Sequence, residues 1–374
     1  SENLRFIIKK MRVEEENLKH FVPDICIKKP NNKDIELVIK KINSAKRPVI
    51  LYGSGIRAAK AQEELKTFIA KYKIPALYSG SSVDILDSNN ELVIGCVGAM
   101  AANRAANFAI QNADLILVLG NRLTTMITGN DINKFAREAE IIAVDIDEFE
   151  HKKFPEKINQ FINSDVKEFL KELNKETAKE TEINWQEKCK HWKKEFPKCE
   201  KKKKNAKDDL YELAEALSEY MEDDAVCITD AGLEELIIPT TVNFKEKQRC
   251  IHPVSQGAMG FALPALIGSY FADKKQNIAV IGDGSVMMNL QELQTIAYHK
   301  MPVKILIINN NCYAVIRKRQ KDLFRTRTIG TDSGNGVSCP DFKKVAQCFG
   351  FKYEKILCYA ELPKLEDILK SDEA

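Results

Sequence analysis

Ile281-Gly-Asp-Gly-Ser285 closes a strand-like apolar run, and a second run, Val303-Lys-Ile-Leu-Ile-Ile308, is followed by Asn309-Asn310-Asn311. The segment between them has apolar residues at helical spacing, which predicts a helix that begins near Ser285. A strand–helix–strand unit of this kind crosses over in the right-handed sense, and its parallel strands end at the same edge of the sheet. The pattern therefore predicts that Asp283 and Asn310 lie side by side at that edge.

These two side chains have the chemistry of a magnesium site. Asp283 offers a carboxylate and Asn310 an amide oxygen, and Mg²⁺ takes about six oxygens, several of them from phosphate and water. Gly284 lets a phosphate approach the backbone closely, and a helix that begins at Ser285 presents free N–H groups and the positive end of its dipole. The residues indicate a magnesium-bridged diphosphate. The stretch is not a Walker loop, because it contains no GxxxxGK[ST].

The rest of the chain predicts an α/β protein of two doubly wound parallel-sheet domains. Continuous apolar runs separated by helical segments indicate parallel strands that are covered on both faces. These runs occupy residues 48–52, 74–78, 113–119, 140–144, 225–229, 277–281 and 303–308. We expect a connector or tail over residues 1–30, a central domain over 31–175, a charged linker with a solvated helix over 176–208, and the diphosphate-binding domain over 209–374.

Composition excludes several classes of protein. Lys and Arg number 57 against 54 Asp and Glu, and a net charge of +3 over 374 residues does not indicate a nucleic-acid partner. No apolar run reaches the roughly 18–20 residues that a membrane span needs. The ten cysteines are scattered without a CxxC pair, which is typical of reduced thiols and predicts a cytoplasmic protein.

Four segments in order resemble thiamine diphosphate (ThDP) enzymes of the acetolactate synthase type. Gly282-Asp-Gly284 with Asn309-Asn310 resembles the GDG…NN signature of that family. The segment from Ser255-Gln-Gly-Ala-Met-Gly260 to Gly268 resembles the part that holds the aminopyrimidine, and Thr229-Asp-Ala-Gly232 resembles the earlier diphosphate loop. The central domain is also similar, so that the likeness covers roughly residues 33–360.

The resemblance implies a role for each matching residue. Asp283, Asn310 and the main-chain carbonyl of Cys312 would hold Mg²⁺. The carbonyl of Gly257 would accept a hydrogen bond from the cofactor's amino group, and Met259 would bend the cofactor into a V shape. The diphosphate would be held by residues at two strand ends: Gly232, Leu233, Gly282, Gly284 and Ser285. The same loop carries Glu234 and Glu235, where relatives often have Gln or His.

Two further residues are candidates for substrate contact. Arg317 follows the metal site, and its guanidinium matches a substrate carboxylate; the alternative is a basic helix on the surface. His252 precedes the pyrimidine segment, where a perturbed histidine would suit a site; the alternative is a histidine with a structural role.

Gly53-Ser-Gly-Ile-Arg-Ala58 supplies a rival hypothesis, because it matches the GxGxxG/A dinucleotide pattern after a strand. That pattern expects an acidic residue at the end of the next strand, where this chain has Tyr78. An NAD-binding oxidoreductase is thus disfavoured. Acetolactate synthases bind FAD in this domain and many relatives bind none, so the sequence leaves FAD open and favours its absence.

The resemblance also implies a missing part. Such enzymes have an N-terminal pyrimidine-binding domain with the glutamate that activates the cofactor, and residues 1–30 are too short to be that domain. We therefore expect a fragment or a split subunit that is inactive alone and has no catalytic residue of its own. The predicted reaction of the complete enzyme is decarboxylation of a 2-keto acid with aldehyde release or carboligation, in a homodimer, a homotetramer or a complex with a pyrimidine-domain subunit. The alternative is a catalytically silent ThDP-binding or regulatory subunit.

Overall fold

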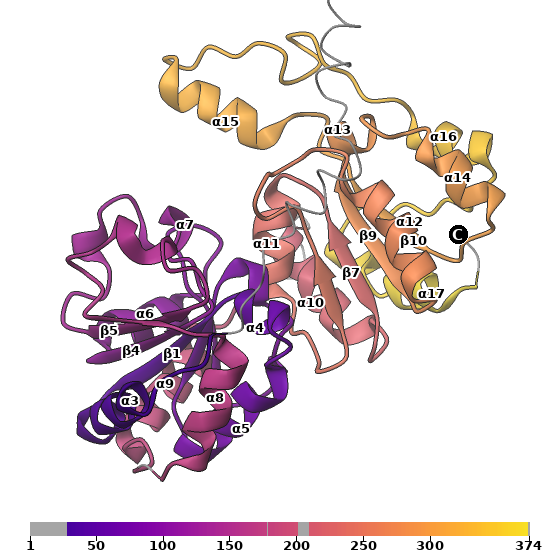
Figure 1. Cartoon of the computed structure of the whole chain (residues 1–374). Coiled ribbons are helices and arrows are strands. Elements are labelled where there is room, and N and C mark those ends of the chain that lie inside the picture. Colours follow the sequence, from indigo (N-terminus) through magenta and orange to yellow (C-terminus); the bar gives the residue numbers. More distant parts are fainter. Residues whose placement is uncertain (1–27, 178, 201–208, 373–374) are drawn as a thin grey trace, which may run out of the picture.

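The computed structural model describes residues 28–177, 179–200 and 209–372. Most of the predicted connector, residues 1–30, lies outside the described residues. Figure 1 shows the two predicted α/β units, the first from indigo to magenta and the second from orange to yellow. Both are parallel sheets flanked by helices, which confirms the predicted fold class.

The central unit is a six-stranded parallel sheet in the order β3-β2-β1-β4-β5-β6. Its strands are β1 (Pro48–Tyr52), β2 (Ala76–Tyr78), β3 (Val93–Cys96), β4 (Leu115–Leu119), β5 (Glu140–Asp145) and β6 (Gln160–Asn163). Its helices are α3 (Asn32–Ser44), α4 (Gly55–Ala58), α5 (Gln62–Tyr72), α6 (Arg104–Asn112), α7 (Thr125–Thr128), α8 (Val166–Lys175) and α9 (Ile183–Glu195), with 3₁₀ turns at η1 (Gly80–Ser82), η2 (Ile132–Lys134) and η3 (Glu150–Lys153).

Strand β1 shows why its run is apolar throughout. Ile50 and Tyr52 pack into one core with α3, α5 and α8, while Val49 and Leu51 pack into a second core with α6 and α9. Because successive side chains of a strand point to opposite faces, a strand that is covered on both faces must be apolar at every position.

The second unit is a four-stranded parallel sheet in the order β10-β9-β7-β8. Its strands are β7 (Val226–Thr229), β8 (Arg249–Ile251), β9 (Asn277–Gly282) and β10 (Lys304–Ile308). Its helices are α10 (Leu210–Tyr220), α11 (Leu233–Thr241), α12 (Ala262–Ala272), α13 (Asp283–Val286), α14 (Glu292–Tyr298), α15 (Ala314–Leu323), α16 (Phe342–Phe349) and α17 (Lys364–Lys370), with a 3₁₀ turn at η4 (Tyr359–Glu361).

The two units are joined by a buried ion-pair network around Asp84. Its carboxylate forms an ion pair with Arg57 at 2.8 Å, and it accepts hydrogen bonds from the main-chain N–H of Cys250 at 2.8 Å and from the side chain of Arg249. Asp84 and Arg57 belong to the central unit, whereas Arg249 and Cys250 lie in β8 of the second unit. One continuous apolar core also extends across both units.

Helix α9 lies in the predicted linker, yet one of its faces is buried. Trp185 and Cys189 belong to the core beneath α6, and the indole N–H of Trp185 donates to the carbonyl of Pro48 at 3.0 Å. The expectation of a solvated interdomain helix is therefore wrong for this face. The sequence did not reveal this buried face, because only two of the thirteen helix residues are buried and most of the others are polar or charged.

The helix expected from Ser285 onward is also different. It is split into α13, which ends at Val286, and α14, which begins at Glu292. Asn289 lies in the break and donates its side-chain N–H to the carbonyl of Gly260 at 2.8 Å. Contact with a loop that precedes it by about 30 residues therefore interrupts the helix, and the four-residue α13 has little dipole to offer.

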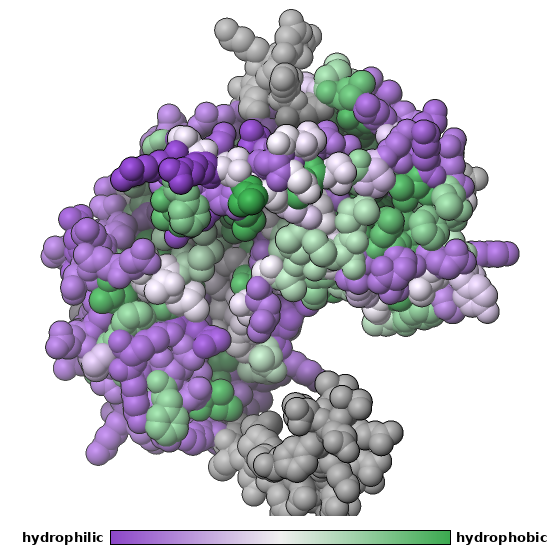
Figure 2. Space-filling view, turned by 90° about the horizontal axis from the view of Figure 1, so that it is seen from above, coloured by the Kyte–Doolittle hydropathy of each residue, from purple (hydrophilic) through white to green (hydrophobic). Residues whose placement is uncertain are grey.

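The surface is mixed in character. Seen from above, several hydrophobic patches interrupt the polar surface (Figure 2). Within the described residues, no helix is both long enough and apolar enough to cross a membrane. Every cysteine in the described part of the chain is a free thiol.

Candidate cofactor and metal site

The site lies at the carboxyl edge of the second sheet, between β7 and β9. Strand β7 leads through α11 to β8 on one side, while β9 leads through α13 and α14 to β10 on the other. Loops that leave neighbouring parallel strands in opposite directions open a crevice between them, and ligands of open α/β sheets bind in such crevices. The end of β10 follows on the far side of β9, as Figure 1 shows.

Asp283 stands at the first turn after β9 and is 2% exposed. Its Oδ1 accepts a hydrogen bond from the N–H of Gly284 at 2.7 Å, and its Oδ2 accepts one from the N–H of Asn311 at 2.5 Å. Because Gly282 and Ile308 are in register on β9 and β10, the loop after β10 lies against this carboxylate. The contact is made by the main chain of Asn311, and the predicted pairing of the Asp283 and Asn310 side chains stays a prediction.

Asn310 and Cys312 lie in that loop on the more exposed side of the edge. The side-chain oxygen of Asn310 accepts from the N–H of Cys312 at 2.9 Å, which orients the amide within the loop. Cys339 approaches from a later segment, and burial together with the charge of Asp283 raises the pKa of its thiol to about 11. At neutral pH this thiol is protonated and adds no charge to the edge.

The donor set suits a hard cation. Among the described residues, no three His, Cys, Asp or Glu side chains converge closely enough to hold a metal ion. A site at Asp283 must therefore be completed by oxygens of another kind, such as the amide of Asn310 and main-chain carbonyls. Carboxylate, amide and carbonyl oxygens are ligands that Mg²⁺ accepts, with phosphate and water filling the remaining positions.

Gly284 and Ser285 continue from Asp283 as the buried first turn of α13. The ring of Tyr313 lies so close to Gly284 that a β-carbon there would overlap it. The hydroxyl of Ser285 faces the carbonyl of Ala231 at 3.4 Å, across the crevice from the end of β7. The sequence predicted that a phosphate would approach the backbone of Gly284 closely. In this structure the ring of Tyr313 occupies that space.

The crevice contains a buried carboxyl group, that of Glu234, to which the sequence assigned no role. Glu234 is 6% exposed. A β-carbon placed on Gly232 or on Gly282 would lie 2.7 Å from one of its carboxylate oxygens, so the group sits between the ends of β7 and β9. Burial raises its pKa to about 7, and the charges of Asp230 and Asp283 act in the same direction. The signal in the sequence was the acidic pair Glu234-Glu235, two residues after the glycine of the loop that follows β7.

The predicted pyrimidine segment forms the end of the loop between β8 and α12 and continues into the first half of α12. Its Gly260 and Ala262 N–H groups donate to the carboxylate of Asp230 at 3.0 and 2.8 Å, which ties the loop to the end of β7. Gly257 has a φ of +58°, and Met259 is 37% exposed at the surface of the loop. Gly257 and Met259 thus lie in a loop that is anchored to the edge of the crevice.

The two candidate substrate residues have partners of their own. The ring Nε2 of His252 is 3.0 Å from the carbonyl of Gly80 in the central unit, so His252 bridges the two units. Arg317 lies on α15 and forms an ion pair with Asp332 at 3.0 Å. No residue of α15 is buried, which agrees with the alternative of a surface helix, and Figure 1 shows α15 apart from the sheet.

The central unit has an equivalent crevice between β1 and β4, where the dinucleotide-like glycines lie. The N–H of Gly53 donates to the carbonyl of Leu119 and that of Gly55 to the carbonyl of Gly120, both at 3.0 Å. A β-carbon on Gly53 would overlap the carbonyl of Gly120, and one on Gly55 would lie 2.7 Å from the α-carbon of Gly120. This backbone contact accounts for both glycines without a nucleotide.

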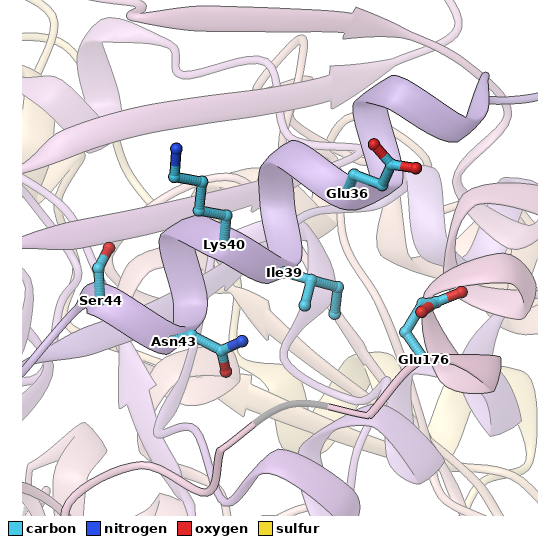
Figure 3. A pocket seen from close by; sticks show the side chains of 6 residues that line it. All are labelled: Glu36, Ile39, Lys40, Asn43, Ser44 and Glu176. Carbon is cyan, nitrogen blue, oxygen red and sulfur yellow. The ribbon is translucent and has the colours of Figure 1, made fainter.

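A surface hollow lies elsewhere, along one side of α3. It has a volume of about 440 Å³, and Figure 3 shows its lining side chains: Glu36, Ile39, Lys40, Asn43, Ser44 and Glu176. Of these only Ile39 is even partly buried, so the hollow is an open groove on the surface. None of its lining residues belongs to the candidate site in the second unit.

The fold and the site together define a class of protein. It has two parallel α/β units, and oxygen groups that suit a metal ion lie at the carboxyl edge of its second sheet. Residues 35–173 match the sequence model described as "Thiamine pyrophosphate enzyme, central domain". Residues 230–373 match "Thiamine pyrophosphate enzyme, C-terminal TPP binding domain". The chain therefore belongs to the thiamine pyrophosphate enzyme family, as the resemblance predicted.

Within that family the chain is similar to acetolactate synthase large subunits. It is 32% identical to that of Porphyra purpurea over 86% of this chain and 54% of the relative. It is 28% identical to the isozyme 2 large subunit of Escherichia coli (strain K12) over 91% of this chain and 60% of the relative. The chain spans a little over half the length of these relatives.

Proposed function

We propose that this chain supplies the diphosphate- and magnesium-binding part of a ThDP-dependent enzyme of the acetolactate synthase type that acts on a 2-keto acid. The observation that carries the proposal is the junction of Asp283 with the loop after β10, where Asp283 Oδ2 accepts from the N–H of Asn311 at 2.5 Å. This junction lies within the segment that matches the C-terminal TPP binding domain.

Each residue of the edge has a proposed task. The side chains of Asp283 and Asn310 and the main-chain carbonyl of Cys312 would hold Mg²⁺. Gly257 and Met259 would hold the aminopyrimidine end, in the loop that Asp230 anchors. The N–H groups and backbone at the ends of β7 and β9 would hold the diphosphate: Gly232, Leu233, Gly282, Gly284 and Ser285.

Bound ThDP would supply the carbanion that attacks the keto carbon and the electron sink for loss of CO₂. The chain's own residues would hold and orient the cofactor. The glutamate that activates the cofactor belongs, by resemblance, to a pyrimidine-binding domain, so we assign no catalytic residue to this chain. We propose that this domain is reached through a homodimer, a homotetramer or a separate subunit in the cytoplasm.

A catalytically silent ThDP-binding or regulatory subunit is the second candidate. The observation that favours it is Glu234, a buried carboxyl group in the crevice that is to receive an anion. Decarboxylation of pyruvate and other 2-keto acids, measured as CO₂ release with the pyrimidine-binding domain present, separates the two candidates. Turnover supports the enzyme, whereas binding of ThDP without turnover supports the silent subunit.

Isothermal titration calorimetry with ThDP and Mg²⁺ tests the binding site itself. Asp283→Ala removes the carboxylate of the proposed metal site, and we expect it to weaken binding by roughly 100-fold or more, since a charged ligand to a buried cation is lost. Asp273→Ala is the matched control, because Asp273 lies in the same unit with a half-exposed side chain and should leave the affinity unchanged. Equal affinity in Asp283→Ala and the wild-type chain would overturn the proposal.

A further inference from the structure

The carboxylate of Glu234 lies between the ends of β7 and β9, where the chain leaves the two strands in opposite directions. Glu234 is the second residue of α11 and lies directly after the turn at Gly232. Its carboxylate lies against the backbone of both strand ends, because a β-carbon on Gly232 or on Gly282 would be 2.7 Å from one of its oxygens. Backbone N–H groups of turns at strand ends are the groups that bind phosphate oxygens in α/β proteins. The carboxylate of Glu234 thus already occupies the space beside these turns.

The surroundings make a second anion unfavourable. Asp230 and Asp283 flank Glu234 at the ends of β7 and β9, and both raise its pKa through their charges. The carboxylate of Asp230 is itself fully buried and engaged by N–H groups of Ala231, Gly260 and Ala262. Two like charges about 4 Å apart repel each other appreciably even in water and more strongly in a buried crevice.

We propose that the Glu234 side chain is an internal competitor for the diphosphate subsite, which makes Mg²⁺–diphosphate binding weak until this carboxylate is displaced or neutralised. The inference rests on the proposed function, because it concerns the same crevice. It assigns Glu234 the role of setting affinity for the diphosphate end of the cofactor. Binding of the diphosphate then requires that Mg²⁺ at Asp283 offsets the negative charge of Glu234, or that the first residues of α11 move.

Glu234→Gln is the direct test, since glutamine keeps the shape and one oxygen acceptor but removes the charge. We expect inorganic pyrophosphate with Mg²⁺ to bind this variant roughly tenfold more tightly than the wild-type chain, the lower end of what one unit charge at this range supplies. Calorimetry at pH 8 measures the affinity directly and requires no turnover. ThDP with Mg²⁺ is titrated in parallel and should show the same ratio.

Glu235→Gln is the matched control, because it removes the same charge from the next residue of α11. The side chain of Glu235 points toward the pyrimidine loop, where a β-carbon on Gly257 would lie 4.0 Å from it. We expect this control to change pyrophosphate affinity by less than about threefold, since its charge is farther from the subsite. Equal gains in the two variants would overturn the specific role of Glu234.

The remaining outcomes are also decisive. If the wild-type chain binds ThDP with Mg²⁺ and Glu234→Gln binds pyrophosphate equally or more weakly, the competitor role is wrong while the proposed function stands. If neither protein binds either ligand, both proposals fail together. Thermal unfolding of each variant checks that it is folded, and Glu234→Ala, which empties the crevice, replaces the glutamine variant if that one does not fold.

Discussion

Replacing Asp84 with alanine tests whether one buried carboxylate holds the two units together. The side chain of Asp84 is 3% exposed and is paired with Arg57 at 2.8 Å and with Arg249. It also accepts the N–H of Cys250 at 2.8 Å. The contacts with Arg249 and Cys250 span 165 and 166 residues of sequence and attach β8 of the second unit to the central unit.

The expected cost follows from the groups that alanine would leave without a partner. Removing one member of a buried ion pair typically costs about 3–5 kcal/mol, and an unpaired buried N–H, here that of Cys250, costs about 1–3 kcal/mol. The side chains of Arg57 and Arg249 are 30% and 38% exposed, so water recovers part of their hydration. We therefore expect the free energy of unfolding to fall by about 3 kcal/mol.

Urea denaturation measures this change without the ionic screening that guanidinium chloride would add. Circular dichroism follows both units, while fluorescence follows Trp185 and Trp192 of α9, which packs on the central unit. In Asp84→Ala we expect the two signals to separate, because the second unit loses its attachment and unfolds at lower urea. In the wild-type chain the two transitions should coincide.

Asp223→Ala provides the comparison with an exposed ion pair. Asp223 pairs with Lys245 at 2.6 Å but its side chain is 84% exposed, so its removal should cost no more than about 0.5 kcal/mol. A loss below about 1 kcal/mol for Asp84→Ala, within the range of exposed pairs, would refute the reasoning, as would coincident transitions. A double-mutant cycle with Arg249→Met then isolates the energy of that pair alone.

Two further outcomes follow from buried groups. Gly53→Ala should lower the free energy of unfolding by about 3 kcal/mol, because its methyl group would overlap the Gly120 carbonyl; a loss below about 1 kcal/mol in urea denaturation would show that the contact yields easily. Lys198 donates to the carbonyl of Val242 at 3.1 Å, and burial lowers its pKa to about 7. Between about pH 7 and 10 the unfolded chain therefore binds a proton that the folded chain does not, so this group makes the wild-type chain more stable as the pH rises. Lys198→Met should be the more stable protein at pH 7, with the difference shrinking by up to about 1.4 kcal/mol per pH unit toward pH 10; a difference that does not vary with pH would contradict the burial of the charged amine.

The strands, and the polar residues that follow them, could be predicted from the sequence. The run that ends in Gly282-Asp-Gly284 and the run before Asn309 predicted a parallel pair with polar groups at one edge, and β9 and β10 are such a pair. Periodicity encodes this much because a strand covered on both faces needs apolar side chains at every position. The crossover rule then leaves few arrangements for the loops.

Contacts between distant segments were not readable. The helix after Asp283 is split because Asn289 bonds to Gly260, and the buried face of α9 depends on a bond from Trp185 to Pro48. Neither partner lies within the few residues over which helical or strand periodicity acts. The local pattern therefore predicted one continuous helix in the first case and a solvated helix in the second.

The sequence by itself determined the family, the two parallel-sheet units and the edge at which Asp283 meets the asparagine loop. Only the tertiary structure decided that Gly53 serves a backbone contact, that Asp84 joins the two units and that Glu234 fills the crevice. The difference has one physical cause. Hydrophobic pattern and strand ends are properties of neighbouring residues, whereas the environment of a charge or a glycine is set by segments that the folded chain brings together.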